Sequence, residues 1–202
     1  DIETTGLSPI EHEIVMIGIA TLKDLDPGAI EVRYFSRDRM DEEDLIFKAI
    51  YELLSRDSNC LVGYNILNFD LPFLSARAHK HELGTSLPSR IRQLYRIDLM
   101  HVVTRYLLTS NRHIKLKDIA GFLNIPYDTE FSGSDIPKLY QERNLQAIMH
   151  HCRKDIETLH NLFFTLKDFC KHNLQRRYNL DCNIEFEGYE KKTIGTLREA
   201  DA

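Results

Sequence analysis

The sequence predicts an α/β fold in which helices pack on a β-sheet. Two β-type segments come first, at residues 14–22 and 31–35, and an Asp-Pro-Gly turn signal at 26–28 separates them. Helical patterns interleaved with short strand patterns follow, and they end in a long amphipathic segment at 145–171. Because strands followed by alternating helices and strands indicate helices laid on a sheet, we expect an α/β architecture.

The elements of the first sixty residues have clear local patterns. Residues 14–22 form an almost unbroken apolar run with β-branched side chains, which is typical of a central strand. Residues 31–35 alternate in polarity and predict the second arm of a hairpin. Residues 41–54 show the apolar spacing of a helix. We interpret the acidic run 41–43 as a solvated first turn favoured by the helix dipole.

The later elements alternate between strand and helix patterns. Residues 60–64 predict a short buried strand, and 71–83 predict a helix that tolerates Pro72 in its first turn. Residues 96–99 predict another short strand. Further helical patterns lie at 100–108, 116–123, 135–143 and 145–171.

The length bounds the domain organisation. A chain of 202 residues can form one domain with a substantial core, or one domain plus a small appendage. We expect a domain over residues 1–171 and a C-terminal tail over residues 172–202, whose polar sequence predicts no clear element. Because a sheet strand carrying Asp1 and Glu3 needs apolar residues before it, we also expect residues upstream of Asp1 in the natural protein.

Four acidic residues on three separated segments predict a metal site. Asp1 and Glu3 lie in Asp-Ile-Glu-Thr-Thr-Gly, Asp70 ends Asn-Phe-Asp, and Asp155 ends Cys-Arg-Lys-Asp. On a strand, residues i and i+2 point to the same face, so Asp1 and Glu3 can converge on one ion. Asp-x-Glu triplets are common in an acidic chain, and only the first precedes a hydroxyl-rich glycine turn. Four carboxylates suit a two-metal phosphodiesterase.

These segments together resemble the DnaQ-like, four-carboxylate (DEDD) 3′→5′ exonucleases of the ribonuclease H-like superfamily. Residues 1–6, 65–74 and 151–155 are similar to the three exonuclease motifs, in the right order, and the second is most similar to the proofreading domain of B-family DNA polymerases. The resemblance covers about residues 1–169 and implies a mixed β-sheet flanked by helices. It also implies two Mg²⁺ or Mn²⁺ ions, held by Asp1, Glu3, Asp70 and Asp155, as cofactors.

The resemblance implies a further residue that activates the attacking water. One branch of the family has tyrosine four residues before the last aspartate, and the other branch has histidine five residues before it. Here His151 stands four before Asp155 and His150 stands five before it. On a helix the two side chains diverge by about 100°, so we expect one of them to reach the site. The surrounding sequence, Cys-Arg-Lys-Asp, favours the alignment with the tyrosine branch and therefore His151. An imidazole can serve as a general base.

Other residues are candidates for contact with the substrate strand. By resemblance and position, these substrate-binding candidates are Thr4, Thr5, Leu7, Asn65, Phe73 and Lys115. The basic groups that can meet phosphate are Arg90, Arg92 and Arg96, then Arg112, Lys115 and Lys117, then Arg153 and Lys154. Each basic group taken alone is more typical of a solvated surface than of a binding site.

Charge, hydropathy and cysteines narrow the class of protein. The net charge of −5 and the pI near 6.0 argue against a broad non-specific nucleic-acid binder, but bound divalent ions would neutralise a local acidic site. No apolar run approaches the roughly 20 residues of a membrane span, so no membrane partner is expected. The four cysteines form no Cys-x-x-Cys pair, and reduced thiols in a cytoplasmic protein are the simplest interpretation.

The sequence therefore predicts a metal-dependent 3′→5′ exonuclease acting on DNA, single strands above all. The preference for DNA rests on the likeness to the polymerase domain. Two alternatives remain open: an exoribonuclease with the same chemistry and an RNA substrate, and a nucleic-acid-binding domain that has lost activity. The second is disfavoured because clustered carboxylates without metal would repel phosphate.

Overall fold

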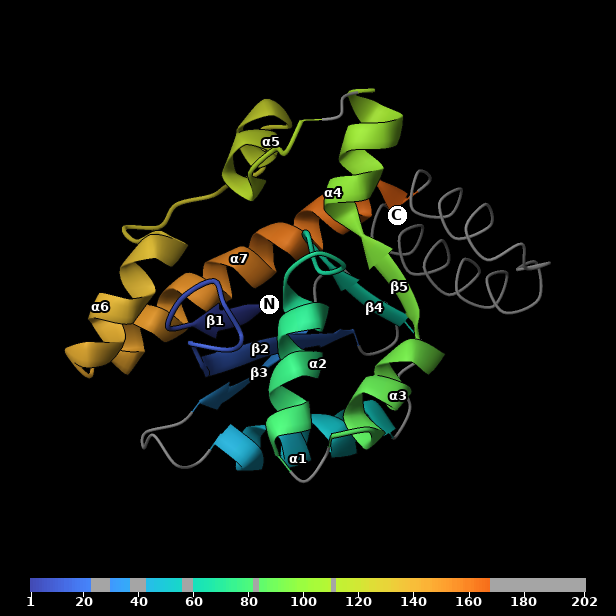
Figure 1. Cartoon of the computed structure of the whole chain (residues 1–202). Coiled ribbons are helices and arrows are strands. Elements are labelled where there is room, and N and C mark those ends of the chain that lie inside the picture. Colours follow the sequence, from blue (N-terminus) through green and yellow to red (C-terminus); the bar gives the residue numbers. More distant parts are fainter. Residues whose placement is uncertain (23–29, 37–42, 56–59, 82–83, 110–111, 168–202) are drawn as a thin grey trace.

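The computed structural model describes residues 1–22, 30–36, 43–55, 60–81, 84–109 and 112–167. The predicted turn at 26–28 and the tail at 172–202 lie outside these residues, as do Cys170 and Cys182. Figure 1 shows the arrangement of the described elements, with strands at the centre and helices around them. The predicted α/β architecture is confirmed.

The strands run both parallel and antiparallel. Strands β1 (Ile2–Thr4), β2 (Ile14–Leu22) and β3 (Ile30–Ser36) form an antiparallel sheet with β2 in the middle. Strands β4 (Cys60–Gly63) and β5 (Tyr95–Asp98) form a parallel pair. The observed β2 has the predicted bounds, because its apolar pattern is continuous and local.

The pairing of β1 with β2 fixes the start of the chain. Ile2 lies opposite Ile17 and Glu3 opposite Met16, and the register shifts between Glu3 and Thr4. All three β1 residues are buried, so the acidic Glu3 side chain enters the core region together with its apolar neighbour Ile2.

Helices surround these strands. The two long ones in the first half are α1 (Glu43–Ser55) and α2 (Asp70–Lys80), and α3 (Ser86–Gln93) follows. Next come α4 (Leu99–Val102) with a π-helical continuation (Val103–Leu107) and α5 (Leu116–Phe122). A 3₁₀ turn (Gly133–Asp135), α6 (Ile136–Gln141) and the long α7 (Leu145–Thr165) complete the described chain.

Helix α7 packs closely against β2, and this contact places the last predicted carboxylate. Gly18 of β2 has no side chain, and a Cβ at this position would collide with Cys152 and Ile156 on α7. The close approach brings the buried side of α7 onto the sheet, in a core cluster with Val15 and Met16. One face of α7 is therefore held against the strand that neighbours β1.

One helix was missed and one local expectation needs correction. Helix α3 has no counterpart among the predicted elements, and burial of Leu87 and Ile91 stabilises it. The acidic run at 41–43 was predicted to be solvated, but Glu43 is 2% exposed. Its carboxylate accepts hydrogen bonds from the Arg77 guanidinium and the Ile14 backbone amide, at 3.0 and 2.9 Å. The prediction of a solvated turn was therefore wrong for Glu43.

Candidate metal centre

Strand β1 presents the first two candidate ligands. Glu3 is 4% exposed, while Asp1 is exposed. One ligand atom from each of Asp1, Glu3 and Cys152 lies within 4.8 Å of the other two. The Glu3 Oε1 atom is buried and has no hydrogen-bond partner among the described residues. An ionisable oxygen in this position needs a cation or a proton to compensate its burial.

The third candidate, Asp70, is the first residue of α2. It is 8% exposed, and the Ile2 backbone of β1 hydrogen-bonds to its carboxyl group. The N-terminal end of α2 therefore lies beside β1, although 66 positions separate Asp70 from Thr4 along the chain. An acidic side chain in the first turn is also favoured by the helix dipole.

The fourth candidate, Asp155, comes from the middle of α7. Its Oδ1 atom accepts a hydrogen bond of 2.9 Å from the Tyr127 hydroxyl. Its Oδ2 atom lies 3.9 Å from Nε2 of His151, one helical turn earlier. The structure thus brings α7 to the same region as β1 and α2.

Electrostatic coupling connects these carboxylates. Burial raises the pKa of Glu3 well above its ordinary value, and the charges of Asp155 and Asp70 raise it further. Burial also raises the pKa of Asp70 and the pKa of Asp155. Like charges at short range in a poorly solvated site disfavour full ionisation, so the cluster is poised to take up a compensating cation.

The donor set fits hard divalent cations. Carboxylate oxygens are the ligands that Mg²⁺ and Mn²⁺ prefer, and the partnerless Glu3 oxygen is a free donor. The Cys152 thiol is a softer group, and burial raises its pKa, which keeps it neutral. Asp1, Glu3, Asp70 and Asp155 are the residues that could hold such ions.

His151 and His150 occupy different environments on α7. His151 is 3% exposed, and His150 is exposed. The Thr129 hydroxyl donates to the Phe131 carbonyl at 3.0 Å, and its oxygen accepts from the Phe131 amide at 3.3 Å and from Nδ1 of His151 at 3.1 Å. This network assigns the Nδ1–H tautomer to neutral His151 and leaves Nε2, the atom near Asp155, with a lone pair.

The predicted substrate contacts of the first motif have distinct roles in the fold. Thr4 donates its hydroxyl hydrogen to the Gly6 carbonyl at 2.7 Å, and Thr5 Oγ1 accepts from the Glu13 amide at 3.0 Å. These bonds hold the turn after β1. Leu7, at the tip of that turn, is 82% exposed.

The remaining predicted contacts fall into three environments. Asn65 adopts φ 61° in the loop before α2, and its side-chain oxygen accepts from Asn68 at 3.1 Å. Phe73 is 2% exposed and packs on Phe69, so its side chain belongs to the core. Lys115 is exposed at the start of α5.

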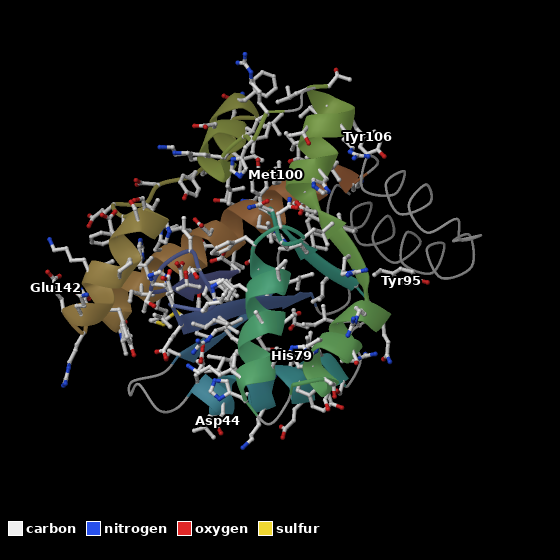
Figure 2. The ribbon with its side chains drawn as sticks, viewed as in Figure 1. Asp44, His79, Tyr95, Met100, Tyr106 and Glu142 are labelled. Carbon is white, nitrogen blue, oxygen red and sulfur yellow. The ribbon has the colours of Figure 1, made fainter. Side chains whose placement is uncertain are left out.

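The sequence did not predict the residues that position the candidate ligands through hydrogen bonds. Fully buried Asp98 accepts backbone hydrogen bonds from Asn65 and Leu67 at 2.9 and 3.1 Å, and it caps α4 through the amide of Met100, labelled in Figure 2. An aspartate before a helical pattern is a capping signal that could have been noticed. Tyr127, which contacts Asp155, carries no such local signal.

Comparison with known proteins gives the family. A model described as RNase H superfamily matches residues 1–167. The chain belongs to the RNase H superfamily. Members of this superfamily are generally hydrolytic nucleases that use divalent metal ions, so a nuclease-type function on nucleic acid is supported at that level. The ribonuclease H-like fold predicted from the three motifs is thereby confirmed.

Two individual proteins are similar to this chain. The uncharacterised protein MJ0365 of Methanocaldococcus jannaschii is 28% identical over 177 residues, which cover 83% of this chain and 93% of that protein. The structure of the family B DNA polymerase from the hyperthermophilic archaeon Pyrobaculum calidifontis matches with a TM-score of 0.63 and 16% identity. That match covers 82% of this chain and 24% of the polymerase chain, so this chain spans about a quarter of the polymerase it resembles in fold. No described helix has the length and apolarity required to span a membrane.

A stability measurement can test the centre without any nuclease assay. Because the pKa of Glu3 is raised in the folded state, the metal-free protein loses stability as pH rises above 4.5, the ordinary value. At pH 7.5, Mn²⁺ at about 100 times its Kd should therefore raise the Tm by roughly 5–10 °C. Glu3→Gln should raise the metal-free Tm and diminish the Mn²⁺ response.

Glu11→Gln provides the control, since Glu11 is exposed on the turn that follows β1. Differential scanning calorimetry with and without Mn²⁺ measures both effects. An identical Mn²⁺ response in Glu3→Gln and the wild type would contradict the assignment of Glu3.

Proposed function

We propose that this protein is a 3′→5′ exonuclease that hydrolyses DNA, preferably single-stranded, by a two-metal-ion mechanism. The observation that carries the proposal is the buried Glu3 Oε1 atom of β1, which has no hydrogen-bond partner among the described residues and lies near Asp155 of α7 and Asp70 of α2. A buried cluster of this kind is costly unless cations bind it. Membership of the RNase H superfamily supports the same class of chemistry.

In this proposal Asp1, Glu3, Asp70 and Asp155 hold the two ions, Mg²⁺ or Mn²⁺. When bound, the ions lower the pKa of water and stabilise charge on the scissile phosphate. Cleavage at the 3′ end would release 5′-mononucleotides. We assign this activity to a domain over residues 1–171, which precedes the predicted C-terminal tail at residues 172–202.

His151 orients the attacking water and accepts its proton. The Nδ1–H to Thr129 contact of 3.1 Å leaves Nε2 as the accepting atom on the side of Asp155. A fixed tautomer is what a general base needs, because rotation or tautomer exchange would remove the lone pair from the reacting water.

The terminal nucleotide meets the turn after β1 and the loop before α2. Thr4 and Thr5 shape that turn for the nucleotide through their hydrogen bonds to Gly6 and Glu13, and the exposed Leu7 can pack beside the terminal base. Asn65 and the exposed Lys115 meet the strand through polar groups. Phe73 supports the loop before α2 indirectly, because its ring packs on Phe69.

The deciding experiment uses 5′-labelled single-stranded DNA and its RNA counterpart. The full chain, extended by any natural upstream residues, is incubated with each in Mg²⁺, in Mn²⁺ and in EDTA. A metal-dependent ladder that shortens from the 3′ end supports the exonuclease, and the faster substrate decides between DNA and RNA. Binding in EDTA without cleavage in either metal would contradict the proposal and favour an inactive binding domain.

A second prediction separates the two histidines. His151→Ala should lower kcat about 10²–10⁴-fold, which is the usual contribution of a general base. His150→Ala should change kcat less than twofold, because the side chain is exposed on α7. Single-turnover cleavage of the preferred substrate measures both rate constants. Equal activity of the two variants would contradict the assignment.

A further inference from the structure

A pocket with a volume of about 250 Å³ lies between α2, α3 and the start of β5. Its apolar wall includes Leu71 and Pro72 from α2 and Ile91 from α3. Arg92 and Arg96 line it as cations. The volume lies below the roughly 300–1,000 Å³ of a complete small-molecule site, which suits one nucleotide unit better than a large cofactor.

The two arginines are available for an anion. Among the described residues, neither Arg92 nor Arg96 forms an ion pair with a carboxylate, and the Arg96 Nε–H is buried without a hydrogen-bond partner. Arg90, grouped with them in the sequence, points elsewhere and donates to the Leu54 carbonyl at 2.7 Å. Arg96 thus lines the pocket and carries a buried N–H donor that lacks its acceptor.

The rest of the lining suits a base and its phosphate. His79 is fixed by a hydrogen bond of 2.7 Å between Nδ1 and the Ser75 carbonyl, which leaves Nε2 free for a ligand. Figure 2 labels His79 on α2, the helix that faces α3. Unstacked bases commonly stack on histidine rings and arginine planes, while their phosphates pair with arginine. The described lining residues include no acidic side chain.

The pocket and the carboxylate cluster are formed in part by adjacent residues of the chain. Leu71 lines the pocket, and the adjacent Asp70 is a candidate metal ligand. Leu67, in the loop held by Asp98, lines the pocket as well. In Figure 1, α2 stands between β1 on one side and α3 with β5 on the other. A strand that crosses the loop before α2 would thus reach both places.

We propose that this pocket binds an internal nucleotide of the single-stranded substrate, with the phosphate on Arg92 and Arg96 and the base against the apolar wall. The assignment of the strand as substrate rests on the proposed nuclease function. The pocket would act as a second anchor, away from the cleaved bond. It would therefore determine affinity and the preferred length of the strand, and leave the rate of the chemical step unchanged.

The test compares Arg92→Gln/Arg96→Gln with a charge-matched control, Arg33→Gln/Arg105→Gln, whose arginines lie on β3 and on the π-helical segment. Fluorescence anisotropy in Ca²⁺ measures the binding of labelled oligothymidylates of 3 and 12 nucleotides at several salt concentrations. The pocket variant should bind the 12-mer roughly tenfold more weakly, and the slope of log K against log salt should fall by about 0.7, because one phosphate is no longer neutralised. Trimer affinity should be unchanged.

Cleavage in Mg²⁺ by the same preparations separates the two proposals. Wild-type cleavage with equal 12-mer affinity and salt slope in the pocket and control variants would overturn the pocket and leave the exonuclease intact. Selective loss of 12-mer binding without any wild-type cleavage would support the pocket and overturn the exonuclease. Absence of 12-mer binding by the wild type would overturn the pocket outright.

Discussion

Replacement of Asp155 with asparagine should reduce cleavage by at least about 10³-fold while the protein stays folded. Metal ions contribute several kcal/mol of charge stabilisation in such sites, and about 4 kcal/mol corresponds to a factor of 10³ in rate. Asparagine has nearly the same shape and can still accept the hydrogen bond from Tyr127, so the packing of α7 on β2 should survive.

The expected change in stability has the opposite sign to the change in activity. Burial raises the pKa of Asp155, so its ionised form opposes folding in the metal-free protein at neutral pH. Asp155→Asn removes that charge and should leave the metal-free Tm unchanged or higher. Loss of activity through misfolding would instead lower the Tm, and circular dichroism melts in EDTA distinguish the two.

Glu157→Gln is the matched control, because it makes the same acid-to-amide change two residues later on the same helix. Glu157 accepts from Arg153 and Lys154 at 2.7 and 3.1 Å within α7, and its side chain is 30% exposed. Ion pairs with this much solvent access contribute about 0–1 kcal/mol to stability. This variant should keep cleavage within about twofold of the wild type, and comparable loss in both variants would contradict a specific role for Asp155.

Elements whose residue pattern is local in the sequence were predicted, and elements that depend on contacts with distant residues were not. Strand β2 has its predicted bounds because nine consecutive residues carry the signal. Helix α3 was missed because its stability comes from burial of Leu87 and Ile91 against other elements. Local patterns contain no information about such partners, so short helices with polar sequences escape them.

The candidate site follows the same rule. The acidic residues stand in three recognisable motifs, and the fold brings Glu3, Asp70 and Asp155 close enough for their charges to interact. The groups that position them, such as Asp98 and Tyr127, act across 28 to 33 positions of sequence. A side chain whose role depends on a distant partner cannot be recognised without the fold.

Replacement of Arg77 with methionine should destabilise the protein by about 3–5 kcal/mol. Arg77 is 2% exposed, and its guanidinium donates to Glu43, to the Glu13 carboxylate at 3.3 Å and to the Pro9 carbonyl at 3.3 Å. Methionine fills similar space but leaves the Glu43 carboxylate buried without its main partner. Removal of one member of a buried pair is costly because the other charge remains desolvated.

The pH dependence of this loss has a definite sign. Burial by itself would raise the pKa of Glu43, but hydrogen bonds from Arg77, Ile14 and His81 outweigh it and hold that pKa below 4.5, its ordinary value. A lowered folded pKa gives stability that is present above the unfolded value and lost as pH falls through the folded one. The difference between wild type and Arg77→Met should therefore be full at pH 7 and shrink below about pH 4.5.

A second substitution distinguishes an unpaired charge from lost packing. Arg77→Met combined with Glu43→Gln removes the stranded charge and keeps an acceptor for the Ile14 amide, so the double variant should be more stable than Arg77→Met alone. Arg33→Met breaks an exposed pair with Glu31, with side chains 47% and 38% exposed, and should cost at most about 1 kcal/mol. Urea unfolding at pH 7 and pH 4 measures all four proteins.

Since Arg77 joins α2 to the start of β2 through Glu43, its loss should also loosen the position of Asp70, and cleavage by Arg77→Met should fall before the protein unfolds.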